Sequence, residues 1–166
     1  KDMAALENVS LPATLTVING EAFKGCTNLS KINYPASLTS VNTWGCVFNG
    51  CSSLKSIPLS PTGLNTFYGS GMEGSGLEVM KLRMKAEEGA VFAGMPNLKH
   101  VFIMKTNLKM TADTFKNLAC ETNFYFYEMT RAEVIKAHGE EWLNNADEKA
   151  HFYFKDTMPE GVEIPE

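Results

Sequence analysis

Three histidines and four cysteines are the side chains of this chain best suited to chemistry. They are His100, His138, His151, Cys26, Cys46, Cys51 and Cys120. The cysteines show no paired Cys-x-x-Cys spacing, and no histidine lies close enough to them in the sequence to form a zinc motif. A cysteine nucleophile with a histidine base is conceivable, but the cysteines have better structural uses. We therefore expect no enzyme activity, no bound metal and no cofactor.

A second set of side chains suits binding rather than catalysis. Aromatic rings supply contact area at a low cost in entropy, and polar neighbours add specificity, so such a set suits recognition of a protein or a glycan. Its members are Lys81, His100, Phe102, Tyr125, His151 and Tyr153. They are far apart in the sequence, so a regular architecture must bring them together.

An internal repeat predicts that architecture. The stretch FKGCTNL at 23–29 returns as FNGCSSL at 48–54. A hexamer with Leu first and apolar residues fourth and sixth occurs six times along the chain, although the last copy lacks the Leu. The fourth residues are separated by 23, 25, 23, 21 and 23 positions, and they are Val9, Ile32, Ile57, Met80, Val101 and Phe124. A period of about 23 predicts coils that stack and bury a shared core.

Each repeat predicts one short strand and one tight corner. The fourth and sixth residues of the hexamer have period 2, so both face the core from a strand. A proline such as Pro35 ends the strand. A phenylalanine, a glycine able to take positive φ, and the next leucine make the corner, as in Phe23, Gly25 and Leu29.

The third and fifth residues of each hexamer must then face outward. The first three coils place small or polar residues there, whereas the later ones place His100, Phe102 and Tyr125. His151 and Tyr153 follow if the last strand joins in the same parity. An exposed patch of this kind predicts a ligand site. The alternative is that the aromatic residues pack against one another or under a neighbouring domain.

Residues 127–166 break the repeat. Thr130 to Glu133 forms a capping box, and apolar residues at helical spacing predict a helix over about 131–144. Alternation at 151–154 predicts a last strand. Because the end of a stack exposes core, we interpret 127–166 as a C-terminal cap and 1–126 as five to six coils.

Two further side chains have structural and functional interpretations. Cys26 and Cys51 occupy equivalent positions in adjacent coils, where parallel Cβ vectors predict a ladder of thiols and not a disulfide. Trp44 is a second candidate for an exposed binding anchor, although folding back over the convex side explains it as well.

Composition excludes some classes of protein. The net charge is −4 and the pI is near 5.4, which argues against nucleic-acid binding. No apolar run approaches the roughly 20 residues that cross a membrane. The chain starts in mid-pattern without a signal peptide, and we expect that an export signal was removed from this fragment.

The repeat resembles the BspA-like leucine-rich repeats, also called the Treponema pallidum type. Residues 22–32, AFKGCTNLSKI, followed by Pro35, are similar to that family's unit, and the resemblance covers about residues 5–126. It implies an α/β repeat fold: a right-handed leucine-rich-repeat solenoid with a parallel sheet of about six short strands. The strand–helix–strand cap looks like that of Bacteroides-type members. The resemblance also implies a cell-surface or secreted bacterial protein, in a family implicated in adhesion and protein binding.

These observations lead to three hypotheses. The first is a non-enzymatic binding module that recognises a protein or glycan through the exposed sheet face. The alternative is a structural spacer or self-association module with no ligand of its own. The third, an enzyme, rests only on Cys46 and the histidines.

Overall fold

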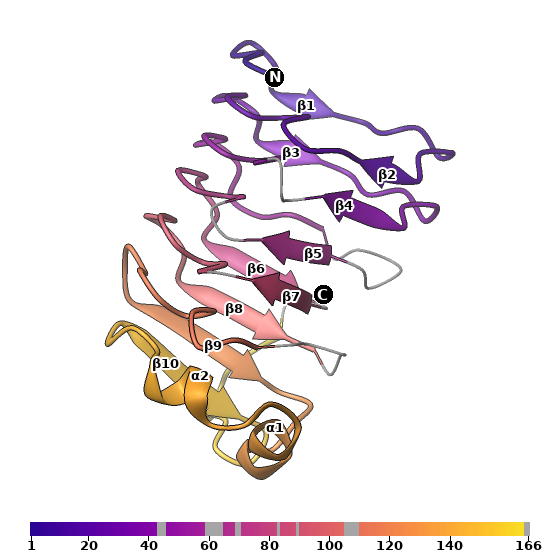
Figure 1. The fold of residues 1–166 in the computed structure, drawn as a ribbon. Coiled ribbons are helices and arrows are strands. Elements are labelled where there is room, and N and C mark those ends of the chain that lie inside the picture. Colours follow the sequence, from indigo (N-terminus) through magenta and orange to yellow (C-terminus); the bar gives the residue numbers. More distant parts are fainter. Residues whose placement is uncertain are drawn as a thin grey trace.

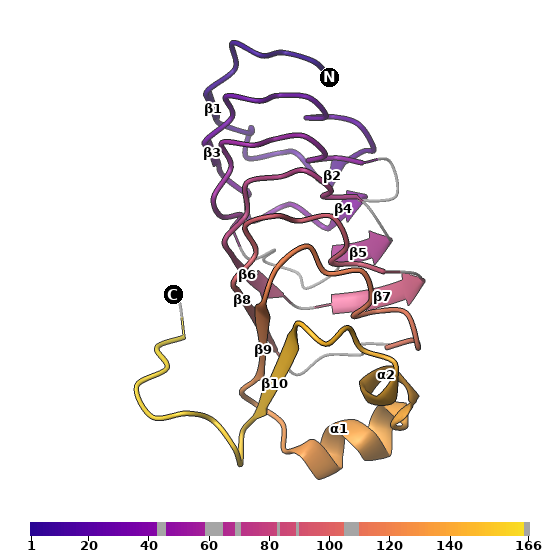
Figure 2. The same ribbon diagram turned by 90° about the vertical axis from the view of Figure 1, so that its left-hand side faces the viewer.

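Short parallel strands in two rows form the structure, a computed structural model that describes residues 1–42, 46–58, 65–68, 71–82, 84–88, 90–104 and 110–164. Figures 1 and 2 show them stacked along one direction, with two helices at the C-terminal end of the stack. The first row contains β1 (Asn8–Val9), β3 (Lys31–Ile32), β6 (Val79–Leu82), β8 (His100–Ile103), β9 (Thr122–Phe126) and β10 (Ala150–Phe154). The second contains β2 (Val17–Ile18), β4 (Ser40–Asn42), β5 (Asn65–Tyr68) and β7 (Met84–Glu88).

The first row is not the single sheet of about six strands that the sequence predicts. It is divided into a β1–β3 pair and a four-stranded sheet with the order β10–β9–β8–β6. Between them, the third repeat contributes an isolated bridge from Ser56 to Val79. Pro58 lies two residues after Ser56, and its missing amide hydrogen removes a donor from the ladder at this level.

The second row was not predicted as a sheet. Its order is β2–β4–β5–β7, and all its pairs are parallel. The sequence pattern marks only a returning apolar residue in each of the first two coils, Ile18 and Val41, and both are buried. With two and three residues, β2 and β4 are too short to show a period, which explains why they were not predicted as strands.

The corners of successive repeats lie directly over one another. Gly25, Gly50, Gly74 and Gly94 all adopt φ between 68° and 72°, and Asn117 takes their place in the last copy with φ of 57°. A residue other than glycine or asparagine is strained in this conformation, so the predicted corner is confirmed.

The core lies between the two rows. The first leucines of four consecutive hexamers, Leu29, Leu54, Leu77 and Leu98, are buried at 0% to 1% exposure. The phenylalanines that open the corners stack on the same core, with Phe92 and Phe115 at 5.7 Å between ring centroids. The predicted inward position of these leucines is therefore confirmed for these coils.

Two helices follow β9, where the sequence predicts one over 131–144. They are α1 (Arg131–His138) and α2 (Glu141–Asn144). Gly139, with φ of 74°, ends α1, and its N–H donates to Ile135 O at 2.8 Å. The capping box between Thr130 and Glu133 is present as predicted.

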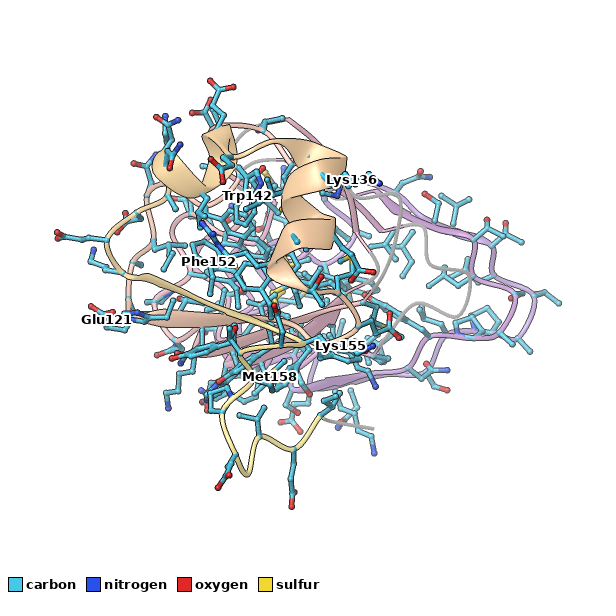
Figure 3. The ribbon with its side chains drawn as sticks, turned by 90° about the horizontal axis from the view of Figure 1, so that it is seen from below. Glu121, Lys136, Trp142, Phe152, Lys155 and Met158 are labelled. Carbon is cyan, nitrogen blue, oxygen red and sulfur yellow. The ribbon has the colours of Figure 1, made fainter. Side chains whose placement is uncertain are left out.

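The end of the core is closed by an aromatic cluster. Trp142 of α2 is 1% exposed, and its Nε1 donates to the Gly139 carbonyl at 2.9 Å. Its ring lies 5.4 Å from Phe115 and 5.3 Å from Phe152, measured between centroids. Figure 3 places Trp142 and Phe152 on one side of β10 and Met158 on the other.

Candidate functional site

The candidate site is the outer face of the four-stranded sheet, which is the side of β6, β8, β9 and β10 turned away from the core. Parallel pairing aligns Lys81 with Phe102, Phe102 with Tyr125, and Tyr125 with Tyr153. The last strand therefore continues the parity of the repeats, as the sequence predicts. We call Phe102, Tyr125 and Tyr153 the aromatic row.

Another row of side chains, which we call the histidine row, runs beside the aromatic row on the same face. It consists of Val79, His100, Asn123 and His151, which are successive partners in the same ladders. Six residues predicted to form the site are thus brought onto one surface from four strands: Lys81, His100, Phe102, Tyr125, His151 and Tyr153.

The rings of the aromatic row stack face to face along the ladder. The centroids of Phe102 and Tyr125 are 4.7 Å apart with planes inclined by 15°, and those of Tyr125 and Tyr153 are 5.2 Å apart at 18°. His100 also stacks on Tyr125, at 5.8 Å. Tyr125, in the middle of the row, packs its two ring faces against Phe102 and Tyr153, so only its ring edges point outward.

The expectation that this face is exposed is wrong for the centre of the row. Phe102 is 4% exposed and Tyr125 is 6% exposed, and neither belongs to the hydrophobic core. Lys81, His100 and Tyr153 are half-buried, and only His151 is exposed. Another part of the chain must cover the middle of the outer face.

The cover is the C-terminal segment, residues 155–164. Figure 2 shows it leaving the end of β10 and turning back beside the outer face of the sheet. A cavity of about 330 Å³ remains between segment and sheet. Its lining residues are Val79, His100, Phe102, Tyr125, Gly161, Val162 and Glu163.

The three lining residues of the segment are candidate site residues that the sequence interpretation missed. A weak signal was available, because Val162 and Ile164 are apolar at alternate positions of an otherwise polar stretch. Such alternation is typical of an extended segment with one side against a surface. Because the segment lies outside the repeat, this signal does not predict which surface of the protein the segment contacts.

One polar contact joins the histidine row to the aromatic row, and a second lies at the end of the histidine row. His100 Nδ1 lies 3.1 Å from the Tyr125 hydroxyl oxygen. Burial, with a smaller contribution from Tyr153, raises the pKa of the Tyr125 hydroxyl, which keeps this group neutral and available for a hydrogen bond. At the end of the histidine row, His151 Nε2 lies 2.6 Å from Glu121 Oε2.

The cysteines lie away from this face. Cys26 and Cys51 are free and fully buried in adjacent coils, as the thiol-ladder interpretation predicts, and Cys51 Sγ lies 3.0 Å from Phe23 O. Cys46 is half-buried with φ of 57°. Trp44, the other candidate anchor, falls outside the described residues.

The described part of the chain contains neither a cluster of metal-ligating side chains nor a helix suited to a membrane. Among the described residues, no group of three His, Cys, Asp or Glu side chains is placed to hold a metal ion. Within the described ranges, neither helix has the length and apolar character that crossing a bilayer demands.

The comparison with protein families matches almost the whole repeat region. The model of the BspA type leucine rich repeat region matches residues 1–124 with six copies. No curated protein and no solved structure matches the chain.

Proposed function

Because the chain belongs to the BspA-type leucine-rich repeat family, we propose that it is a non-enzymatic binding module of a bacterial cell-surface or secreted protein. Repeats of this kind are typical of protein-interaction modules. The proposed site is the outer face around the aromatic row, and the proposed partner is a protein or a glycan.

The aromatic row is the observation that supports this proposal. The core lies on the other side of the sheet, so folding does not require aromatic residues on the outer face. The early repeats carry small or polar residues at the same positions, such as Ser10 and Asn33, whereas β8 and β9 carry Phe102 and Tyr125. Rigid aromatic side chains on a regular scaffold suit recognition.

We also propose the organisation that presents this face. Residues 1–126 form the coils of a right-handed solenoid, and residues 127–166 form its C-terminal cap. Parallel crossover connections are right-handed in about 98% of known cases, which supports this handedness. The cap closes the core with Trp142 and supplies β10 to the outer face.

A structural spacer or self-association module is the second candidate. The burial of Phe102 and Tyr125 favours it, because a covered row can serve packing alone. This reading predicts that affinity for outside ligands is absent and that the molecular mass grows with concentration.

The experiment that tests the proposal is a binding screen against a defined panel of extracellular-matrix proteins and a glycan array. His100→Glu changes a half-buried residue that lines the cavity. Lys31→Glu is the matched control, because it changes an exposed residue on the first-row strand β3, remote from the aromatic row.

We expect a partner whose affinity falls at least about tenfold in His100→Glu and stays unchanged in Lys31→Glu. Circular dichroism would establish that both variants fold. Equal affinity in all three proteins would move the site away from the outer face. Absence of any partner, together with a light-scattering mass that rises with concentration, would favour the spacer.

A further inference from the structure

The C-terminal segment is loosely held where it crosses the outer face. It begins with a turn in which Phe154 N donates to Thr157 Oγ1 at 3.0 Å and Thr157 N donates to Phe154 O at 2.9 Å. Beyond this turn, no hydrogen bond or ion pair joins the described residues 158–164 to the sheet. Only Met158 and Val162 are half-buried, and the other five residues are exposed.

The stacking of the aromatic row decides which chemistry fits the face. A sugar ring that stacks on an aromatic side chain needs an open ring face, but both faces of Tyr125 are occupied by Phe102 and Tyr153. The outward ring edges carry the positive part of the aromatic quadrupole, so they attract a carboxylate.

The segment has the composition that this surface favours. Val162 and Glu163 both line the cavity that His100, Phe102 and Tyr125 also line, so an aliphatic residue and an acidic residue of the segment adjoin the space in front of the ring edges. A volume of about 330 Å³ is still unfilled, which shows that the segment does not exhaust the space available on the face.

We propose that the outer face binds an extended peptide that presents an aliphatic side chain beside a carboxylate, and that residues 158–164 occupy this place within the chain until such a peptide displaces them. The inference rests on the proposed function and narrows its partner to an acidic, aliphatic peptide. A tethered segment competes at a high effective concentration, so it lowers the apparent affinity of any outside peptide.

The test uses the full chain and a fluorescent synthetic peptide with the sequence of residues 158–164. Val162→Lys replaces a half-buried aliphatic side chain that lines the cavity with a positively charged one. Ile164→Lys is the matched control, since it makes the same charge change at an aliphatic residue that is 42% exposed. Fluorescence anisotropy would measure the affinity of the peptide for each protein.

We expect the peptide to bind Val162→Lys at least about tenfold more tightly than the wild type and Ile164→Lys. A peptide with Gln in place of Glu163 would bind more weakly. Nitration of Tyr125 by tetranitromethane, mapped by mass spectrometry, would increase in Val162→Lys and fall again when the peptide is added.

Weak binding that is equal in all three proteins would overturn the inference, as would a Gln peptide that binds as well as the acidic one. A glycan that binds Val162→Lys where the peptide does not would also overturn it. The proposed function fails separately: a panel partner sensitive to His100→Glu but indifferent to the peptide would keep the binding module and reject the peptide.

Discussion

Ser75 is a polar side chain at an apolar position of the repeat. It follows Gly74 as Cys26 follows Gly25 and Cys51 follows Gly50, so it belongs to the column of buried thiols. Its hydroxyl is fully buried and has no hydrogen-bond partner in the described structure. A buried hydroxyl that gives up water without a new partner costs about 1–3 kcal/mol.

We predict that Ser75→Ala raises the free energy of unfolding by about 1 kcal/mol, because it removes this desolvated group. Ser37→Ala is the matched control, since the Ser37 hydroxyl donates to Leu15 O at 2.7 Å. That variant should lose about 1 kcal/mol. Denaturant titration measures both changes, and a loss of stability in Ser75→Ala would contradict the prediction.

Cys51 makes the stability of the chain sensitive to alkali. Burial, assisted by the neighbouring Cys26, raises the pKa of the Cys51 thiol from an ordinary 9.0 to about 11. Between these values the unfolded chain loses this proton while the folded chain keeps it. The stability it contributes is therefore present below pH 9 and is lost as pH rises toward 11.

The wild type should lose about 2 kcal/mol more than Cys51→Ala between pH 8 and pH 11. The quantity compared is the change in the free energy of unfolding with pH, so the pH-independent loss of stability caused by removing the side chain cancels. Unfolding in denaturant under reducing conditions, repeated across this range, measures it. Parallel pH profiles for the two proteins would show that Cys51 does not carry the effect.

At the scale of the element, the stacked corners set the geometry of each repeat. Gly50 has φ of 72°, and a Cβ added there would meet nothing closer than Gly25 at 3.8 Å. Space is therefore available, and backbone conformation alone resists substitution. Asn117 shows that asparagine adopts the same conformation at this place in the last copy.

We predict that Gly50→Ala costs about 1–2 kcal/mol and that Gly50→Asn costs clearly less. Thermal or chemical unfolding of the two variants would measure the difference. If asparagine were as costly as alanine, side-chain volume rather than φ would be the constraint.

The first-row strands were largely predictable from sequence because their pattern is one-sided and periodic. Val101 and Phe124 face the core, so Phe102 and Tyr125, which directly follow them, must face outward, and the observed register agrees. In the second row of strands, β2 and β4 escaped prediction because they have only two and three residues. The break between α1 and α2 depends on one residue, Gly139, inside an otherwise helical pattern.

The candidate site was predictable in its membership but not in its exposure. Period and parity follow from the local sequence, which is why six residues from four strands could be grouped. The cover depends on where residues 158–164 go after β10, and a short polar segment without a repeat carries little information about its path.

At the scale of the whole molecule, the stack is uneven from end to end. The first strands have two residues each, and Met3 and Val17 of the first coil are 57% and 39% exposed. At the other end β9 and β10 have five residues each and contact the aromatic cluster of the cap. In repeat architectures stability is roughly a sum over neighbouring units, so the two ends should open independently.

We predict that the amides of Val101 and Phe124 exchange with deuterium at least about 100 times more slowly than those of Val9 and Ile18. Hydrogen exchange followed by NMR or mass spectrometry would measure this gradient. Uniform protection along the chain would mean that the whole stack unfolds as one cooperative unit.

The proline of the third repeat has a mechanical consequence. Among the described residues, the first row has no ladder between β3 and the third repeat next to Pro58, and an isolated Ser56–Val79 bridge follows. In the second row of strands, β4 and β5 are paired at this level. A bending load along the stack therefore meets a stiff side and a compliant side at one level. The molecule should flex there as a one-way hinge, opening on the side of the first row and leaving the aromatic sheet to move as a rigid plate.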